Sequence, residues 1–201
     1  MSYNKTRLKI LEVSRELFAR FGVANTTMLD VAKYSGVGRR TLYTYFRSKD
    51  DLYYAVIEAE LERLSTRLRE VSQKNMSPQE KVIELIYTHL MLIKETVVRN
   101  GSLRAEFFRN IWKVEKVRKD FDEAEIEIFT KVFADAKAAG IFDIENVKMV
   151  AEIAHYCIKG LEVPFIYGRL GAGMSPASSR DVVAKFVYGA LGGSKDVYNK
   201  V

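Results

Sequence analysis

Hydrophobic residues recur at helical spacing along almost the whole chain. In the first segment, Ile10, Leu17 and Phe21 fall on one face, as in an amphipathic helix. Strand-like alternation of apolar and polar residues is absent from the sequence. The pattern predicts an all-α protein of about nine helices. We expect these helices over residues 5–21, 26–34, 38–45, 48–72, 78–100, 103–112, 114–139, 144–170 and 176–191.

Two of these helices, over 26–34 and 38–45, are short and adjacent, as in a helix-turn-helix. Ala32 offers a small side chain where two helix backbones approach each other. Gly36, four positions later, tolerates the positive φ that a sharp turn requires. The apolar residues placed to fill the wedge between the helices are Val31, Val37 and Leu42. The segment therefore predicts a helix-turn-helix that binds DNA.

Positive charge is concentrated in the same part of the chain. Residues 1–50 hold ten Lys and Arg against four Asp and Glu, whereas residues 51–201 hold 22 of each. The net charge of +6 thus arises entirely in the first quarter. The second short helix also opens with Arg39 and Arg40, on the turns where a recognition helix meets base edges. This distribution favours a polyanion as the partner of the N-terminal region. The alternative is that the basic residues cluster there by chance.

The run TTMLDVAKYSGVGRRTLYTYFRSKDDL over residues 26–52 is similar to the DNA-binding signature of the TetR family of bacterial transcriptional regulators. The similarity begins around Ile10 and covers about a quarter of the chain; the remainder resembles the family in length and helical character. One departure is Gly38, where the family usually has serine, although glycine is an acceptable N-cap. The DNA-binding residues that the resemblance implies are Thr26, Thr27, Gly38, Arg39, Arg40, Thr41, Tyr43, Tyr45 and Lys49.

The chemistry of the second helix fits these roles. Arg39 and Arg40 can donate to guanine O6 and N7, or one of them can bind a phosphate. Thr41 can touch a thymine methyl group. The hydroxyls of Tyr43 and Tyr45 can hydrogen-bond the DNA backbone, while the alternative is that these rings belong partly to the core.

Phosphate contacts are expected on either side of that helix. Thr26 and Thr27 open the preceding helix, where hydroxyls and unpaired amides can take a phosphate. Lys49 lies in the first turn of the helix over 48–72, a position that a docked phosphate would make favourable for a cation. The alternatives are that Thr26 is only a helix cap and that Lys49 is only solvated.

Residues 53–201 carry no catalytic or metal-binding signature, so we expect no cofactor and no metal. His89 and His155 are far apart in sequence, and His155 and Cys157 diverge on a helix, which disfavours shared zinc ligation. This region resembles the helical bundle of the TetR family, which encloses a small molecule. The alternative is that its aromatic residues are ordinary core residues. The candidate pocket residues are Tyr87, His89, Phe107, Phe108, Trp112, Phe129, Phe133, His155 and Tyr156.

The last two predicted helices have wide apolar stripes, which indicates a four-helix interface between two copies of the chain. Burial within a single chain is the alternative. The candidate interface residues are Ile153, Ile158, Leu161, Phe165, Val183, Phe186, Val187 and Ala190.

Together these patterns predict a dimeric, sequence-specific transcriptional regulator, with a DNA-binding domain over 1–50 and a ligand-binding and dimerisation domain over 51–201. Repression is the expected mode, with release from the operator by a partly apolar or aromatic small molecule. The alternatives are an architectural DNA binder without an effector and a helical-bundle enzyme. A single cysteine and the lack of a signal peptide or membrane-length apolar run lead us to expect a soluble, cytoplasmic protein.

Overall fold

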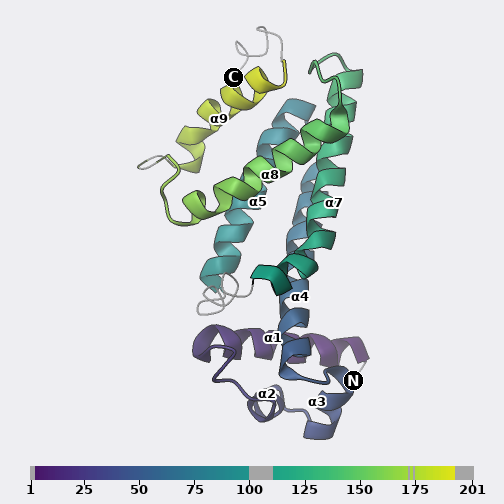
Figure 1. Cartoon of the computed structure of the whole chain (residues 1–201), viewed down its shortest axis with the longest axis vertical. Helices are drawn as coiled ribbons and strands as arrows, with labels where there is room; N and C mark the ends of the chain where they lie inside the picture. Colours follow the sequence, from purple (N-terminus) through teal and green to yellow (C-terminus); the bar gives the residue numbers. More distant parts are fainter. Residues whose placement is uncertain (1–2, 100–110, 172, 174, 193–201) are drawn as a thin grey trace. The chain divides into compact units, whose positions relative to one another are not determined.

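The computed structural model describes residues 3–99, 111–171, 173 and 175–192, and every regular element in these ranges is an α-helix (Figure 1). This confirms the predicted all-α class. The predicted helix over 103–112 lies almost wholly outside the described residues. The helices are α1 (Tyr3–Phe21), α2 (Met28–Ser35), α3 (Arg39–Tyr45), α4 (Lys49–Ser72), α5 (Pro78–Arg99), α7 (Ile111–Ala138), α8 (Val147–Ile166) and α9 (Pro176–Ala190).

The contacts within the chain divide it into two compact units. Unit 1 comprises residues 1–63 and 95–120, and unit 2 comprises residues 64–94 and 121–201. Helices α4, α5 and α7 each contribute residues to both units, because the division falls inside them.

Unit 1 is built on a small apolar core beneath its helix-turn-helix. α1 packs against α2, and α2 packs against α3 (Figure 1). Ile10 and Phe18 of α1, Leu42 of α3 and Leu52 of α4 are completely buried. The edge of the Phe18 ring meets Tyr53, with ring centroids 6.3 Å apart. Burial of each large apolar side chain contributes about 1.5–3 kcal/mol, so this core holds the short helices α2 and α3 in place.

Unit 2 has a larger core made by the end of α4 and by α5, α7, α8 and α9. Phe129 and Phe133 of α7 are buried, with ring centroids 5.8 Å apart. The end of α9 is held by a hydrogen bond of 3.1 Å from the Asp143 amide to the Leu191 carbonyl. Unlike a purely apolar core, this one also encloses ionisable side chains, which are described below.

Candidate nucleic-acid interface

The turn between α2 and α3 has the geometry that the sequence predicts. Gly36 has φ 64° and ψ 26°, in the left-handed region, and its amide donates to the carbonyls of Ala32 and Lys33. The Val37 amide also donates to Ala32, at 3.2 Å. Because a side chain is strained at positive φ, glycine suits this corner better than other residues. Ala32 and Leu42 are buried between the two helices, as expected.

The start of α2 is stabilised by reciprocal hydrogen bonds between Thr27 and Asp30. The Thr27 amide and hydroxyl donate to Asp30 Oδ2 at 2.9 and 2.6 Å, and the Asp30 amide donates to Thr27 Oγ1 at 3.1 Å. The bond from the Thr27 hydroxyl lowers the pKa of Asp30. This capping box fixes the beginning of α2 and leaves Thr27 at the surface.

The position of Thr26 does not fit the phosphate contact that the family resemblance implies. It is only 2% exposed, and its hydroxyl donates to the Gly22 carbonyl at 2.8 Å. This hydroxyl therefore joins the end of α1 to the following loop, and we omit Thr26 from the proposed DNA contacts.

The face of α3 away from the core carries the candidate base contacts. Arg39, Arg40 and Thr41 are exposed, whereas Leu42 points into the core. The Arg39 guanidinium lies 5.9 Å from the centroid of the Tyr43 ring, which keeps this arginine beside the same surface. The two arginines thus project outward from the first turn of α3.

The N-terminus of α3 begins at Gly38, which has φ −64° and ψ 145° and offers no side-chain cap. A negative φ of this size is open to any residue. The absent side chain therefore leaves the amides at this helix end uncovered by a capping group.

Tyr43 and Tyr45 are both accessible, although to different degrees. Tyr43 is exposed and Tyr45 is half-buried, and the Tyr45 ring lies 6.5 Å from the buried ring of Phe46. Tyr45 thus has a core contact as well as an accessible surface.

Lys49 has a local role that sequence reasoning missed. Its Nζ donates to the Val23 carbonyl at 2.8 Å and to the Ala24 carbonyl at 3.2 Å. These bonds tie the first turn of α4 to the loop between α1 and α2. The lysine therefore holds the loop that leads into α2, and the sequence contained no local signal for acceptors 26 residues earlier.

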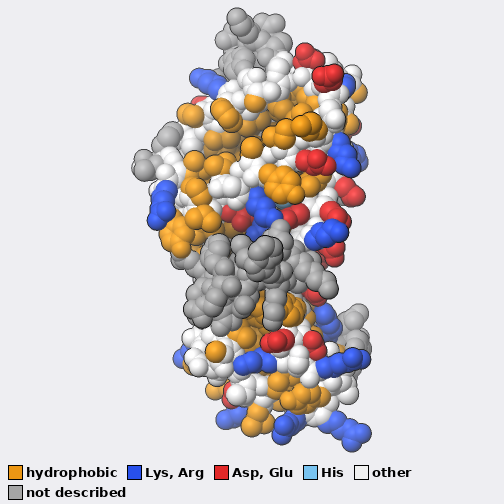
Figure 2. Space-filling view, viewed as in Figure 1, with side chains coloured by type: hydrophobic (Ala, Val, Ile, Leu, Met, Phe, Trp, Pro, Cys, Tyr) orange, Lys and Arg blue, Asp and Glu red, His pale blue; other side chains and the backbone are white. Residues whose placement is uncertain are grey.

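Other cations surround this surface. Figure 2 shows Lys and Arg side chains gathered at the end of unit 1 that carries α2 and α3. Lys33 of α2 and Arg47, two residues after the end of α3, are exposed and were not among the predicted DNA contacts. The excess of basic residues in the first fifty positions was the signal that contained them.

The pocket residues predicted for the C-terminal region are distributed between the interior and the surface. His89, Phe129, Phe133 and His155 are buried, and Tyr87 is buried with its hydroxyl 2.7 Å from Ser179 Oγ. Three further predicted pocket residues cannot be placed in the same way: Phe107 and Phe108 lie outside the described residues, and Trp112 is described only as part of the α7 backbone.

Tyr156 is not in the interior with the other pocket candidates. It is 62% exposed, and it lines an open groove on the outer side of α8 together with Met149, Glu152, Ile153 and Cys157. Its ring meets the edge of the buried His155 ring, with ring centroids 5.1 Å apart, but Tyr156 itself stays at the surface. We therefore omit Tyr156 from the proposed pocket.

The two buried histidines share one carboxylate. Glu125 accepts from His89 Nδ1 through one oxygen and from His155 Nδ1 through the other, each at 2.6 Å. Glu162 lies 3.1 Å from His89 Nε2, and Asp122 lies 3.6 Å from His155 Nε2. These five residues connect α5, α7 and α8 through polar contacts in the core.

The acidic neighbours determine the charge of both histidines. Burial alone would lower the pKa of His89, but Glu125 and Glu162 outweigh it and raise this pKa to about 9. Burial likewise opposes protonation of His155, while Asp122 and Glu125 raise its pKa to about 9. Both side chains are therefore cations at neutral pH, each placed between carboxylates.

Helices α8 and α9 carry a largely apolar outer surface. Figure 2 shows hydrophobic side chains gathered over these helices. Phe186 is 78% exposed, and Ile153 and Ala190 are also exposed. The other predicted interface residues that remain accessible, each half-buried, are Leu161, Phe165, Val183 and Val187.

Ile158 departs from that set. It is only 3% exposed in the single chain, because it points into the core of unit 2. We therefore omit it from the proposed interface.

In the described part of the chain, none of the helices has both the length and the hydropathy needed to cross a lipid bilayer.

Known proteins share both the N-terminal motif and the overall fold. Residues 10–56 match the family described as bacterial regulatory proteins, tetR family. The HTH-type transcriptional regulator QacR of Staphylococcus aureus is 24% identical over 156 residues, which span 76% of this chain and 82% of QacR.

Solved structures extend the similarity to the whole fold. Salmonella enterica GusR is 25% identical, with a TM-score of 0.68 over 95% of this chain and 97% of that one. A TetR-family transcriptional regulator from Mesorhizobium loti, at 14% identity, has a TM-score of 0.75 over 96% and 99% of the two chains. The fold is thus shared well beyond the segment that carries the helix-turn-helix.

Proposed function

The chain is a DNA-binding transcriptional regulator of the TetR family, and we propose that it acts as a dimeric repressor that a small molecule releases from its operator. This membership places it among regulators and not among enzymes. Its proposed place of action is the cytoplasm. The proposed DNA-binding domain is 1–50 and the proposed effector and dimerisation domain is 51–201, although compact unit 1 extends along α4 to Arg63.

The outward projection of Arg39 and Arg40 from α3 is the observation that carries the proposed operator recognition. Both guanidiniums are exposed on the first turn of a helix whose other face is buried. Arginine can donate two parallel hydrogen bonds to guanine in the major groove, and this contact discriminates strongly between bases. In this proposal Thr27, Gly38 and Tyr43 contact the backbone or fix the docking position, and Thr41 contacts a base.

The outer surface of α8 and α9 supports a second copy of the chain as the partner. Exposed apolar side chains such as Phe186 and Ile153 lose contact with water when two such surfaces meet. A two-fold interface uses the same patch on both copies, which suits a pair of neighbouring helices. The monomer–dimer equilibrium of Phe186→Glu, followed by light scattering, should shift toward monomer, whereas Leu8→Glu, at an exposed position of α1, should leave it unchanged.

Effector control is proposed as a shift between two dimer conformations. Two recognition helices reach successive major grooves only when they are about 34–36 Å apart, or a multiple of that distance. A small molecule that binds better to a dimer with another spacing lowers operator affinity by its differential affinity for the two states. The aromatic interior of unit 2, with Phe129 and Phe133, supports an apolar or aromatic ligand.

Selection of bound duplexes from a random DNA library tests this function. We expect an inverted repeat whose half-site centres are about 10 base pairs or a multiple apart. Recovery of duplexes without a shared sequence would instead support an architectural DNA binder. An effector screen on the selected operator then measures release.

A further inference from the structure

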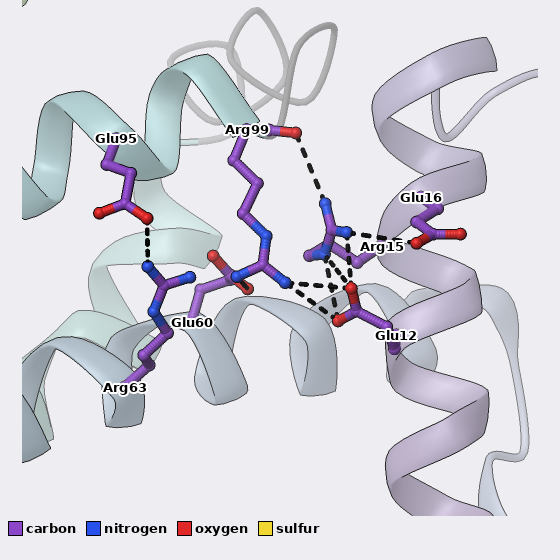
Figure 3. A network of polar contacts seen from close by, with 7 residues as sticks. All are labelled: Glu12, Arg15, Glu16, Glu60, Arg63, Glu95 and Arg99. Atoms are coloured by element: carbon purple, nitrogen blue, oxygen red, sulfur yellow. Dashed lines mark hydrogen bonds and ion pairs between the residues drawn. The ribbon is translucent and has the colours of Figure 1, made fainter.

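Charged side chains from three helices meet beside α1 in unit 1 (Figure 3). The carboxylate of Glu12 lies next to the guanidinium groups of Arg15 and Arg99. The members are Glu12, Arg15 and Glu16 of α1, Glu60 and Arg63 of α4, and Glu95 and Arg99 at the end of α5.

Glu12 is shared by two arginines from different helices. Arg15 Nη2 donates to Glu12 Oε1 at 2.7 Å, while Arg99 Nη2 lies 3.0 and 3.1 Å from the two carboxylate oxygens. The bonds from Arg15 in particular lower the pKa of Glu12. Because charge-assisted bonds of this kind are directional, they define how α5 meets α1 as well as holding the two together.

The last turn of α5 is held by further contacts. Arg15, whose residue is 8% exposed, directs Nη1 to the Arg99 carbonyl at 3.5 Å, where a helix C-terminus favours positive charge. On the other side, Arg99 Nη1 is 3.8 Å from Glu60, and Arg63 Nη2 is 2.5 Å from Glu95. The end of α5 is therefore fastened to α1 and α4 at separate points.

These contacts fit a role in orientation better than a role in overall stability. Isolated exposed ion pairs contribute about 0–1 kcal/mol, and the Glu12 and Arg99 side chains are both partly exposed. Their arrangement nevertheless selects one placement of α1 against α5. Since α1 packs on α2 and α2 on α3, the placement of α1 also sets the direction of the recognition helix.

We propose that Glu12, Arg15 and Arg99 are positioning residues for DNA binding, which hold α1 at the end of α5 so that the two recognition helices of a dimer keep the spacing of the operator. This inference rests on the proposed function, because it needs a dimer and an operator with two half-sites. None of the three side chains has to touch DNA. A loss of the contacts therefore acts on the binding of two half-sites together, and not on the binding of one.

The test compares two duplexes in the full chain: the selected palindrome, and the same duplex with one half-site scrambled. Glu12→Gln and Arg99→Gln should each weaken palindrome binding by about tenfold, within the usual range of coupling between sites. Binding to the single half-site should stay within about twofold, since such coupling is absent there. The double variant should lose no more than either single variant, because both changes break the same contact.

Two further variants complete the experiment. Arg99→Lys retains a cation opposite Glu12 and should recover part of the lost affinity. Arg67→Gln is the matched control, because Arg67 forms an exposed ion pair of 2.7 Å with Glu70 inside α4 and should affect neither duplex.

Four results would overturn the inference: equal losses on both duplexes, additive losses in the double variant, no recovery with Arg99→Lys, or a loss with Arg67→Gln. A wild-type chain that binds the palindrome no better than the half-site would instead contradict the proposed dimeric function. The two failures are therefore distinguishable in the same titrations.

Discussion

The two units differ in where they place positive charge and in what that charge contacts. In unit 1, Arg39 and Arg40 project from α3 into solvent, where a polyanion can reach them. In unit 2, His89 and His155 are completely buried and lie against carboxylates of their own chain. Exposed cations are available for recognition, whereas buried cations are already compensated. Charge alone therefore does not identify a binding surface, because the partners of a charged group decide its role.

Removal of the shared carboxylate in unit 2 should have the largest effect, and it tests whether the buried cations depend on their anionic partners. Glu125→Gln keeps the side-chain volume but leaves two buried imidazolium groups without their common anion. Breaking a buried ion pair in this way typically costs about 3–5 kcal/mol, so the free energy of unfolding in urea should fall by that amount. Glu127→Gln, at an exposed position of the same helix, is the control and should change it by less than about 0.5 kcal/mol.

The pH dependence of stability gives the second test. His89 and His155 have pKa values raised to about 9 in the folded chain, against about 6.5 in an unfolded one. Their contribution is therefore complete below pH 6.5 and is lost as the pH rises through about 9. A shift of this size in one group corresponds to about 3 kcal/mol. Because both histidines share Glu125, their contributions do not simply add, and we expect the free energy of unfolding to fall by about 3 kcal/mol or more as the pH rises through this range.

The groups that face these histidines are Glu125 and Glu162 for His89, and Asp122 and Glu125 for His155. Unfolding curves measured at a series of pH values check the prediction. A variant with both histidines replaced by glutamine should lose the slope, and a slope that persists in that variant would contradict our assignment.

Sequence reasoning succeeded where the decisive contacts are local. Gly36 follows Ala32 by four residues, so a short stretch contains both members of this contact, and Thr27 caps the helix that it was expected to open. These local signals placed α2 and α3 within one or two residues of their observed ends, although Asp30, the partner of Thr27 in the capping box, was not predicted.

The same reasoning missed contacts made between distant segments. Glu125 is 36 residues from His89 in sequence, and Glu162 is 73 residues from it. Each glutamate has charged neighbours in its own helix and has no local sign of burial. Only the packing of α5, α7 and α8 brings these side chains together, and no periodicity within one helix encodes that packing.

Replacement of Arg40 tests the recognition surface of unit 1. Arg40→Ala should weaken operator binding by about 1–3 kcal/mol and relax specificity at one base position. Its effect on the free energy of unfolding should be small, because the side chain is exposed. Titrations against the operator and its single-base variants measure both effects. An equal loss on all sequences would show that Arg40 contacts phosphate instead of a base.

Replacement of Lys49 tests whether this cation binds DNA or stabilises unit 1. Lys49→Met removes the hydrogen bonds to the Val23 and Ala24 carbonyls, and we expect the free energy of unfolding to fall by about 1 kcal/mol. A phosphate contact would instead weaken all DNA sequences alike and reduce the slope of log affinity against log salt by about one. Measurement of stability and salt slope in this one variant separates the two roles.

Gly38 gives the smallest and most specific test, because this position can accept a side chain. A Cβ added there would lie 3.7 Å from Thr41 Oγ1, an ordinary contact, and its φ of −64° is open to serine. Since serine caps a helix slightly better than glycine, Gly38→Ser should raise the free energy of unfolding by a few tenths of a kcal/mol. Gly36→Ser is the contrasting control and should lower it, because Gly36 has a positive φ. If Gly38→Ser stabilises unit 1 but weakens operator binding, the backbone at this helix end approaches the DNA too closely for a side chain. If the affinity is unchanged or rises, a hydroxyl is tolerated there and the glycine makes no close contact with DNA.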